Sequence, residues 1–167
     1  MRIIGGESKG RAIRLPGGCS IRPTADRVKE ALFNILGSVE GKSLLDLFAG
    51  CGNVGLEALS RGACGSVFVE KDLRLIETIR ANLRLLGFEG RAEVIAADAE
   101  EGVRRLRKRG ERFDVLFADP PYEEGFVTEI MTCLEGAELL NENGIIILQH
   151  SLREPLRQSV TQPLVVT

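Results

Sequence analysis

Short, continuous apolar segments alternate along most of the chain with segments in which apolar residues recur every three or four positions. The first kind is typical of buried parallel strands, and the second of helices that bury one face. Strands are predicted at residues 44–48, 66–70, 92–97, 113–118 and 144–149, and helices from the glycine loop to about 61, at 73–86, at 99–109 and at about 124–138. This order predicts an α/β fold with a doubly wound, mostly parallel, Rossmann-like sheet and helices on both faces.

The two ends of the chain follow other patterns. Residues 2–4 and 11–15 are expected to pair as an N-terminal β-hairpin, and a helix that ends at Gly37 should follow. Its apolar stripe is predicted at Val28, Ala31, Leu32, Ile35 and Leu36. A short helix at 152–158 and a strand at 164–166 complete the predicted elements. We expect a single domain over 1–167, with the hairpin and helix in 1–40 and the α/β core in 41–167.

Composition and charge narrow the function classes. The chain is 44% hydrophobic and 28% charged, which is ordinary for a globular protein, and the N-terminus has no apolar signal segment. A cytoplasmic protein without a membrane span is therefore expected. Residues 1–30 hold seven Lys and Arg against three Asp and Glu, so they carry +4, and the net charge of −2 leaves −6 for the rest. A basic segment on an acidic body suits contact with a polyanion.

Metal and disulfide chemistry are not expected. The four cysteines, at 19, 51, 64 and 133, form no C-x-x-C pair, and the chain has a single histidine. This spacing predicts reduced thiols and no zinc site. The histidine, His150, is interpreted as structural rather than catalytic.

Candidate chemistry gathers just after the predicted strands, where ligands bind in doubly wound sheets. Gly50 and Gly52 follow the first strand in a literal G-x-G-x-x-G, a weak signal of a nucleotide loop by itself. Glu70 lies 20 residues after Gly50, a spacing at which a strand-end carboxylate can accept from ribose hydroxyls. Asp98 ends the third strand and suits either an adenine amine or the N-cap of the next helix.

The sharpest motif is Asp119-Pro120-Pro121-Tyr122, after the fourth strand. Its two prolines lack N–H groups, so the turn presents a carboxylate and carbonyl oxygens without internal donors. Such a turn fits a planar group that carries N–H donors, and Tyr122 offers a face on which a base can stack. A rigid loop with a packed tyrosine would also explain the prolines.

Together these residues carry a family resemblance. Asp46-Leu-Phe-Ala-Gly50-Cys-Gly52, Glu70, Asp98 and Asp119-Pro-Pro-Tyr122 resemble the class I S-adenosylmethionine-dependent methyltransferases that modify exocyclic nitrogens. The N-terminal Arg2-Ile-Ile-Gly-Gly6 and Gly10-Arg11, and the segment from Arg22-Pro-Thr to Asn34, look like the bacterial RsmD family. That family methylates N2 of a guanine in 16S ribosomal RNA.

The resemblance implies roles for individual residues. S-adenosyl-L-methionine would be held by Asp46, Phe48, Gly50, Gly52, Glu70, Asp98 and Ala99. Asp119, Pro120 and Tyr122 would be catalytic. The phosphates of ribosomal RNA, free or within an assembling small subunit, would be bound by Arg2, Lys9, Arg11, Arg14, Arg22 and Arg27. Family members usually have Ser at the position of Cys51, and they extend past the position of Thr167 to finish an antiparallel hairpin.

Three alternatives stay open at this point. The same motifs fit methylation of adenine N6 in DNA or RNA. The G-x-G-x-x-G alone would suit a nicotinamide- or flavin-dependent oxidoreductase, although some 40 residues precede it and hydride transfer has no use for Asp-Pro-Pro-Tyr. An RNA-binding module without catalysis is the third.

Overall fold

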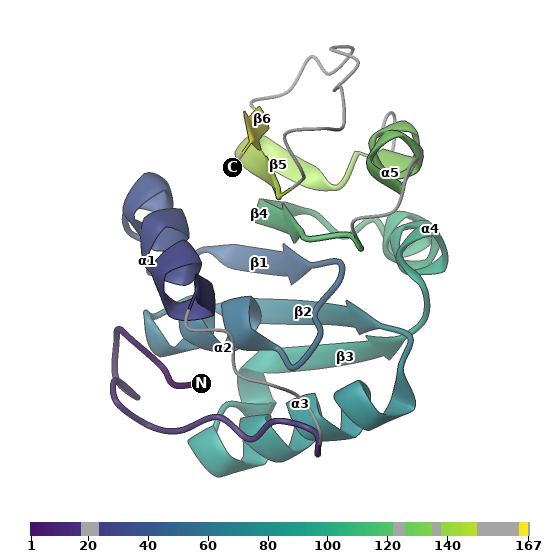
Figure 1. Cartoon of the computed structure of the whole chain (residues 1–167). Helices are drawn as coiled ribbons and strands as arrows, with labels where there is room; N and C mark the ends of the chain where they lie inside the picture. The colour runs from purple at the N-terminus through teal and green to yellow at the C-terminus, as the bar shows by residue number, and fades with distance from the viewer. Residues whose placement is uncertain (18–23, 122–125, 135–137, 150–163, 167) are drawn as a thin grey trace.

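A six-stranded parallel sheet forms the centre of the protein (Figure 1). The computed structural model describes residues 1–17, 24–121, 126–134, 138–149 and 164–166. The strands are β1 (Ser43–Asp46), β2 (Gly65–Glu70), β3 (Ala92–Ala96), β4 (Phe113–Ala118), β5 (Leu140–Leu148) and β6 (Leu164–Val166). The helices are α1 (Thr24–Leu36), α2 (Asn53–Ser60), α3 (Leu73–Leu86), α4 (Ala99–Arg109) and α5 (Phe126–Leu134), with a 3₁₀ turn at Glu89–Arg91.

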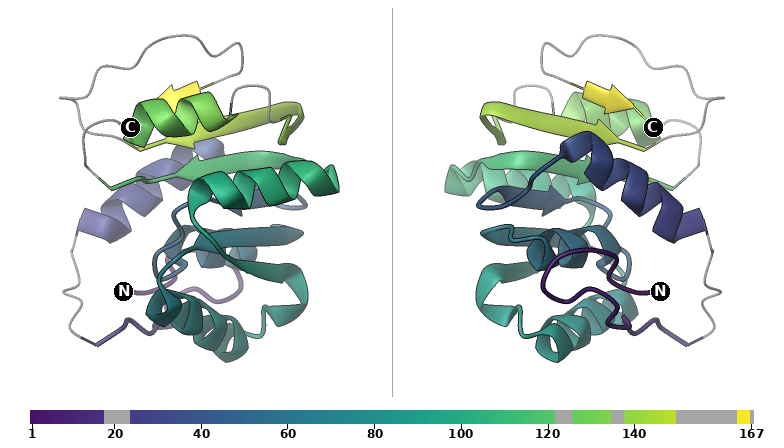
Figure 2. Two further views of the ribbon diagram at one scale, coloured as in Figure 1. Left: turned by 90° about the vertical axis from the view of Figure 1, so that its right-hand side faces the viewer. Right: turned by 90° about the vertical axis from the view of Figure 1, so that its left-hand side faces the viewer.

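The strand order β3-β2-β1-β4-β5-β6 confirms the predicted doubly wound sheet and puts the topological switch between β1 and β4. On one face, β1, β2 and β4 pack with α4 and α5 through buried side chains that include Leu47, Val69 and Leu116. The other face packs against α1, α2 and α3. Figure 2 gives the side views of these layers. Ligand chemistry is therefore expected where β1, β2, β3 and β4 end.

The predicted N-terminal hairpin is reduced to a short pairing. Residues 1–17, the N-terminal arm, contain a single antiparallel bridge between Arg2 and Ala12. The turn of the arm bonds to α2 instead of extending the ladder, since the N–H of Glu7 donates to the Ser60 carbonyl at 2.8 Å. Ile3 and Ile13 are buried against α2 and α3, so the arm is part of the packed protein.

The predicted stripe of α1 is confirmed at Leu32 and Leu36 and is wrong at Ala31 and Ile35. Its buried face holds Lys29, Leu32, Phe33 and Leu36, whereas Ala31 is exposed and Ile35 is 50% exposed. The stripe shifts because Phe33 enters the core and because Lys29, a charged residue, finds buried partners. A pattern that counts only apolar residues misses such a face.

The last elements differ from the prediction in extent and direction. β5 begins at Leu140, before the predicted start at 144, and β6 runs parallel to β5. The terminal antiparallel hairpin implied by the family resemblance is therefore not formed by β6. A parallel partner needs a crossover of about a dozen residues, and residues 149–163 are long enough for it. The helix predicted at 152–158 and His150 lie outside the described residues.

Three features of the described residues bear on the function class. None of their helices is long and apolar enough to cross a membrane. Cys51, Cys64 and Cys133 form no disulfide with one another, and Cys19 lies outside the described ranges. In the same ranges no group of His, Cys, Asp and Glu side chains is arranged to hold a metal ion.

Candidate functional site

A cavity of about 1020 Å³ opens at the ends of β1, β2, β3 and β4. Its size is at the upper end of the range for small-molecule sites. It lies where the arrowheads of β1, β2 and β3 point in Figure 1. Of the predicted site residues, the cavity wall includes Phe48, Glu70, Asp98, Ala99, Asp119 and Pro120. The fold thus brings together residues that are spread over more than 70 positions of the chain.

The glycine loop, residues 49–52, lies beside the cavity and not in its wall. Gly50 and Gly52 have φ values of 56° and 82°, a conformation that side chains disfavour. Gly52 is also the N-cap residue of α2. Both glycines are thus required by the turn itself, and the loop directs the first N–H groups of α2 toward the strand ends.

Glu70 fixes this loop to the end of β2. One of its carboxylate oxygens accepts from the Gly50 N–H at 2.8 Å. The other accepts from the N–H groups of Lys71 and Asp72 at 2.8 and 2.9 Å. A carboxylate has about four acceptor positions, so Glu70 keeps about one for a ligand while it holds the loop in place.

Asp46 lies behind the loop, at the end of β1, and is 1% exposed. Its Oδ2 accepts from the Gly55 N–H at 3.3 Å. Its Oδ1 is buried, and within the described part of the chain it has no hydrogen-bond partner. A buried acceptor without a donor is costly, so Asp46 is an unsatisfied group behind the glycine loop, and it does not line the cavity.

The third glycine of the loop motif brings α2 against the sheet. A Cβ on Gly55 would lie 2.3 Å from Cε1 of Phe68 and 2.7 Å from the Ser66 hydroxyl. No side chain fits there without moving β2 or α2. Gly55 therefore has a packing role, and it also donates the one hydrogen bond that Asp46 accepts.

Carboxyl groups gather at this edge of the sheet, and two of them have raised pKa values. Burial raises the pKa of Asp46 to about 7, and the nearby charges of Asp119 and Glu70 add to that increase. Burial also raises the pKa of Asp119 to about 6. Carboxylates that ionise this reluctantly favour a ligand that brings positive charge or several donors.

Asp98 combines the two roles considered for it. Its Oδ1 accepts from the Glu101 N–H at 2.8 Å and so caps α4. The same residue lines the cavity, together with Ala99. The N-cap interpretation is confirmed, and contact with a ligand stays a prediction.

One wall of the cavity was missed by the sequence. Ile130, Thr132 and Cys133 of α5 line it, and burial raises the pKa of the Cys133 thiol. The spacing of apolar residues in this segment predicts a helix, but it does not tell which helix lines the cavity. Lys71, Asp72, Leu75 and Pro121 also line the cavity. Pro121 could have been found, because it belongs to the Asp-Pro-Pro-Tyr motif.

The predicted RNA-binding residues lie away from the cavity wall. The side chains of Arg2, Lys9, Arg11, Arg14 and Arg27 are exposed. The arm follows α3, where the Arg11 guanidinium donates to the Leu85 carbonyl and the Arg14 N–H donates to Asn82. The predicted residues Arg22 and Tyr122 lie outside the described ranges.

Known proteins resemble the chain over almost its whole length. The protein YlbH of Bacillus subtilis (strain 168) is 40% identical over 161 residues, which cover 96% of this chain and 88% of YlbH. Ribosomal RNA small subunit methyltransferase D of Escherichia coli (strain K12) is 36% identical over 157 residues, with 93% of this chain and 77% of that protein covered.

Solved structures agree with the fold. That of the hypothetical protein TTHA0928 from Thermus thermophilus superposes with a TM-score of 0.80 at 33% identity, and the match covers 93% of this chain and 89% of that one. The family model described as "Conserved hypothetical protein 95" matches residues 1–165. The chain therefore belongs to this family, which is the RsmD family that its motifs resemble.

Proposed function

We propose that this protein transfers a methyl group from S-adenosyl-L-methionine to the exocyclic N2 amine of a guanine in small-subunit (16S) ribosomal RNA. The observation that carries the proposal is the half-buried Asp119 next to Pro120 in the wall of the cavity at the strand ends. The name of the Escherichia coli relative supports ribosomal RNA of the small subunit as the substrate. Such a substrate also implies a cytoplasmic protein.

The residues of the site fit this cofactor. The buried and unpartnered Oδ1 of Asp46 marks a place where a donor-rich, positively charged ligand would relieve an unsatisfied acceptor. Glu70 would accept from a ribose hydroxyl with its remaining acceptor position. Asp98 and Ala99 would hold the purine, and Phe48 would contribute apolar wall. When bound, S-adenosyl-L-methionine supplies a methyl group on a positively charged sulfur.

Asp119 and Pro120 would orient the amine that attacks. The Asp119 carboxylate and the Pro120 carbonyl oxygen accept from the two N–H groups, which turns the nitrogen lone pair out of conjugation with the purine. The same oxygens stabilise the positive charge that develops on nitrogen during transfer. Asp119 acts in its ionised form, and it later accepts a proton from a methylated amine that is far more acidic than the free one.

The N-terminal arm would hold the RNA backbone. The exposed side chains of Arg2, Lys9, Arg11 and Arg14 can bind phosphates without reading sequence. A guanine amine inside folded RNA must be unstacked before it reaches the cavity, and Tyr122 would stack on the flipped base. Contacts between the arm and the RNA backbone would offset part of the free energy that unstacking the base costs.

The experiment that tests this function is identification of the methylated nucleoside. Unmodified 16S ribosomal RNA, both naked and assembled into small subunits, is incubated with the protein and methyl-labelled cofactor, then digested to nucleosides. We expect label in N2-methylguanosine, and the two forms of RNA tell which particle is the substrate. Label in N6-methyladenosine would favour the adenine alternative. RNA binding without incorporation in either form would favour a binding module.

A further inference from the structure

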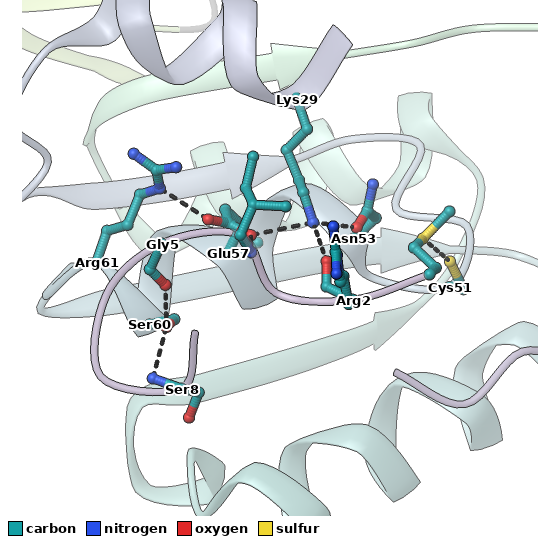
Figure 3. A network of polar contacts seen from close by, with 12 residues as sticks. Arg2, Gly5, Ser8, Lys29, Cys51, Asn53, Glu57, Ser60 and Arg61 are labelled. Atoms are coloured by element: carbon teal, nitrogen blue, oxygen red, sulfur yellow. Dashed lines mark hydrogen bonds and ion pairs between the residues drawn. The ribbon is translucent and has the colours of Figure 1, made fainter. Parts of the chain in front are cut away.

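The most deeply buried ion pair among the described residues lies outside the cavity. Lys29, on α1, is 1% exposed, and its ion-pair partner Glu57, on α2, is fully buried. Figure 3 shows Lys29, Asn53, Glu57 and Arg2. Together with the backbone of Ile4 they form a group that we call the Lys29 cluster. The mechanism proposed above gives this cluster no role.

Each hydrogen of the Lys29 ammonium has an acceptor, one on the N-terminal arm and two on α2. The first is the Arg2 carbonyl of the N-terminal arm, at 2.7 Å. The second is the Asn53 side-chain oxygen at 2.8 Å, on the residue that follows the glycine loop. The third is Oε2 of Glu57, in the body of α2, at 3.0 Å. One atom thus joins the arm to both the first residue and the body of α2.

Glu57 is equally well satisfied. Its Oε2 also accepts from the Ile4 N–H of the arm at 2.9 Å, and its Oε1 accepts from Arg61 at 2.8 Å. The arm therefore has two backbone groups fixed by the buried pair. A further contact joins the Met1 sulfur to the Cys51 sulfur of the loop, at 3.7 Å.

Stability alone is a poor reason to keep such a pair. Removing two charges from water costs several kcal/mol per ion, and apolar replacements are often equally stable or more so. What an apolar replacement cannot do is hold three backbone segments in one defined arrangement. Here the arm carries the proposed RNA surface, and α2 begins directly after the proposed cofactor loop.

We propose that Lys29 is a positioning residue, which fixes the N-terminal arm and the glycine loop in one arrangement, so that the RNA-binding surface and the cofactor site form together. This inference rests on the proposed function. Loss of the ammonium would free the Asn53 side chain at the start of α2, directly after the loop that ends at Gly52. It would also free the Arg2 carbonyl. Asp119 and Pro120 would be untouched.

The test compares Lys29→Met with Lys108→Met, a matched change at an exposed position on α4. Affinity for S-adenosylhomocysteine, the demethylated cofactor, is measured by calorimetry on folded protein. We expect Lys29→Met to bind at least about threefold more weakly, with a raised KM for cofactor and a nearly unchanged kcat. Lys108→Met should bind like the unaltered protein. Hydrogen exchange should be faster at the Ile3, Ile4 and Ile13 amides of the Lys29 variant.

A purely structural Lys29 predicts a different result. The melting temperature would fall, while the folded variant would bind S-adenosylhomocysteine with less than a threefold loss and exchange its arm amides at unaltered rates. Either unchanged readout would overturn the proposal. If Lys29→Met does not fold, Asn53→Ala decides, because it removes one acceptor and keeps the ion pair. It should weaken binding in the same direction, and unchanged affinity would overturn the proposal.

Failure of the proposed function is distinguishable from failure of this inference. If the unaltered protein itself does not bind S-adenosylhomocysteine, the proposed function is wrong. The exchange rates of the arm amides, measured on the free protein, still tell whether Lys29 positions the arm.

Discussion

Asp46 precedes the glycine loop in the sequence, and Glu57 follows it. Both carboxylates are buried, and they differ in how many hydrogen-bond donors and charged partners they have. Glu57 has a partner on both oxygens, from Lys29, Ile4 and Arg61. Among the described residues, Asp46 has one hydrogen bond, from Gly55, and the charges of Asp119 and Glu70 near it have its own sign. Burial alone therefore does not tell what a charged residue does. Glu57 is satisfied by the protein itself, whereas one oxygen of Asp46 lacks a donor among the described residues.

Replacement of Asp119 should change the rate of methyl transfer more than any other substitution discussed below. We expect Asp119→Ala to lower methyl transfer by about 10²–10³-fold, the usual effect of removing one group that stabilises transition-state charge. Affinity for S-adenosylhomocysteine should stay the same, because Asp119 would act on the amine. Single-turnover transfer and calorimetry measure the two quantities. Glu142→Ala, on the exposed part of β5, is the control, and transfer by Asp119→Ala at that control's rate would refute the role.

Asp46→Asn should stabilise the free protein and weaken cofactor binding. The folded-state pKa of Asp46 is raised to about 7 from 3.8. The contribution of Asp46 to the free energy of unfolding is thus fully present below about pH 4, and it is lost as the pH rises through about 7. The variant should therefore exceed the unaltered protein at pH 8 by up to about 4 kcal/mol in the free energy of unfolding.

At pH 4, urea unfolding should show the two proteins to be nearly equal. A variant that is less stable than the unaltered protein at pH 8 would contradict an unsatisfied Asp46.

Gly55→Ala should destabilise the protein by about 1–3 kcal/mol, because the new methyl group would overlap Phe68. Gly90→Ala is a clean control, since nothing lies within 4 Å of its added Cβ. Thermal unfolding of both variants measures the difference. Equal melting temperatures would show that α2 does not pack on β2 as described.

The pH dependence of kcat/KM should follow Asp119 in the free enzyme. Since the pKa of Asp119 is about 6, the rate constant should fall about tenfold per pH unit below that value. Above pH 7 this group should give no further increase. Initial rates from pH 5 to 8 measure the profile. A profile that stays level down to pH 5 would mean that Asp119 titrates as an ordinary exposed carboxylate.

The smallest effect is expected on the N-terminal arm. Lys9→Ala should weaken RNA binding modestly and reduce the slope of log affinity against log salt by about one. Cofactor affinity should not change, because Lys9 is exposed and does not line the cavity. Fluorescence titration of an RNA fragment at several salt concentrations gives the slope. An unaltered slope would remove Lys9 from the RNA surface.

The sequence predicted the fold best where burial is nearly complete. Residues 113–118 form β4 as predicted, because five of the six are apolar and buried, and such a run in a parallel sheet leaves few alternatives. Asp119, Glu70 and Asp98 could be placed at one edge for a related reason, since parallel strands end on the same side. The prediction failed where polar groups are buried, as at Lys29, because partners distant in the chain decide their burial.

Neither the wall formed by α5 nor the state of Asp46 could be predicted. Cys133 and Ile130 reach the cavity through the packing of α5 against α4 and the sheet, which no local pattern encodes. Asp46 was assigned from a motif, and only the fold tells that one of its oxygens lacks a donor among the described residues.

In the free protein, Asp46 and Asp119 at the edge of the sheet should both have raised pKa values that a bound ligand lowers at Asp46. Carbon-detected NMR titration of the aspartate carboxyl groups in the free protein measures these pKa values. We predict midpoints of about 7 for Asp46 and about 6 for Asp119, with Asp46 shifting to lower pH when S-adenosylhomocysteine binds. Midpoints of about 4 for both groups, the usual value for aspartate, would contradict the claim.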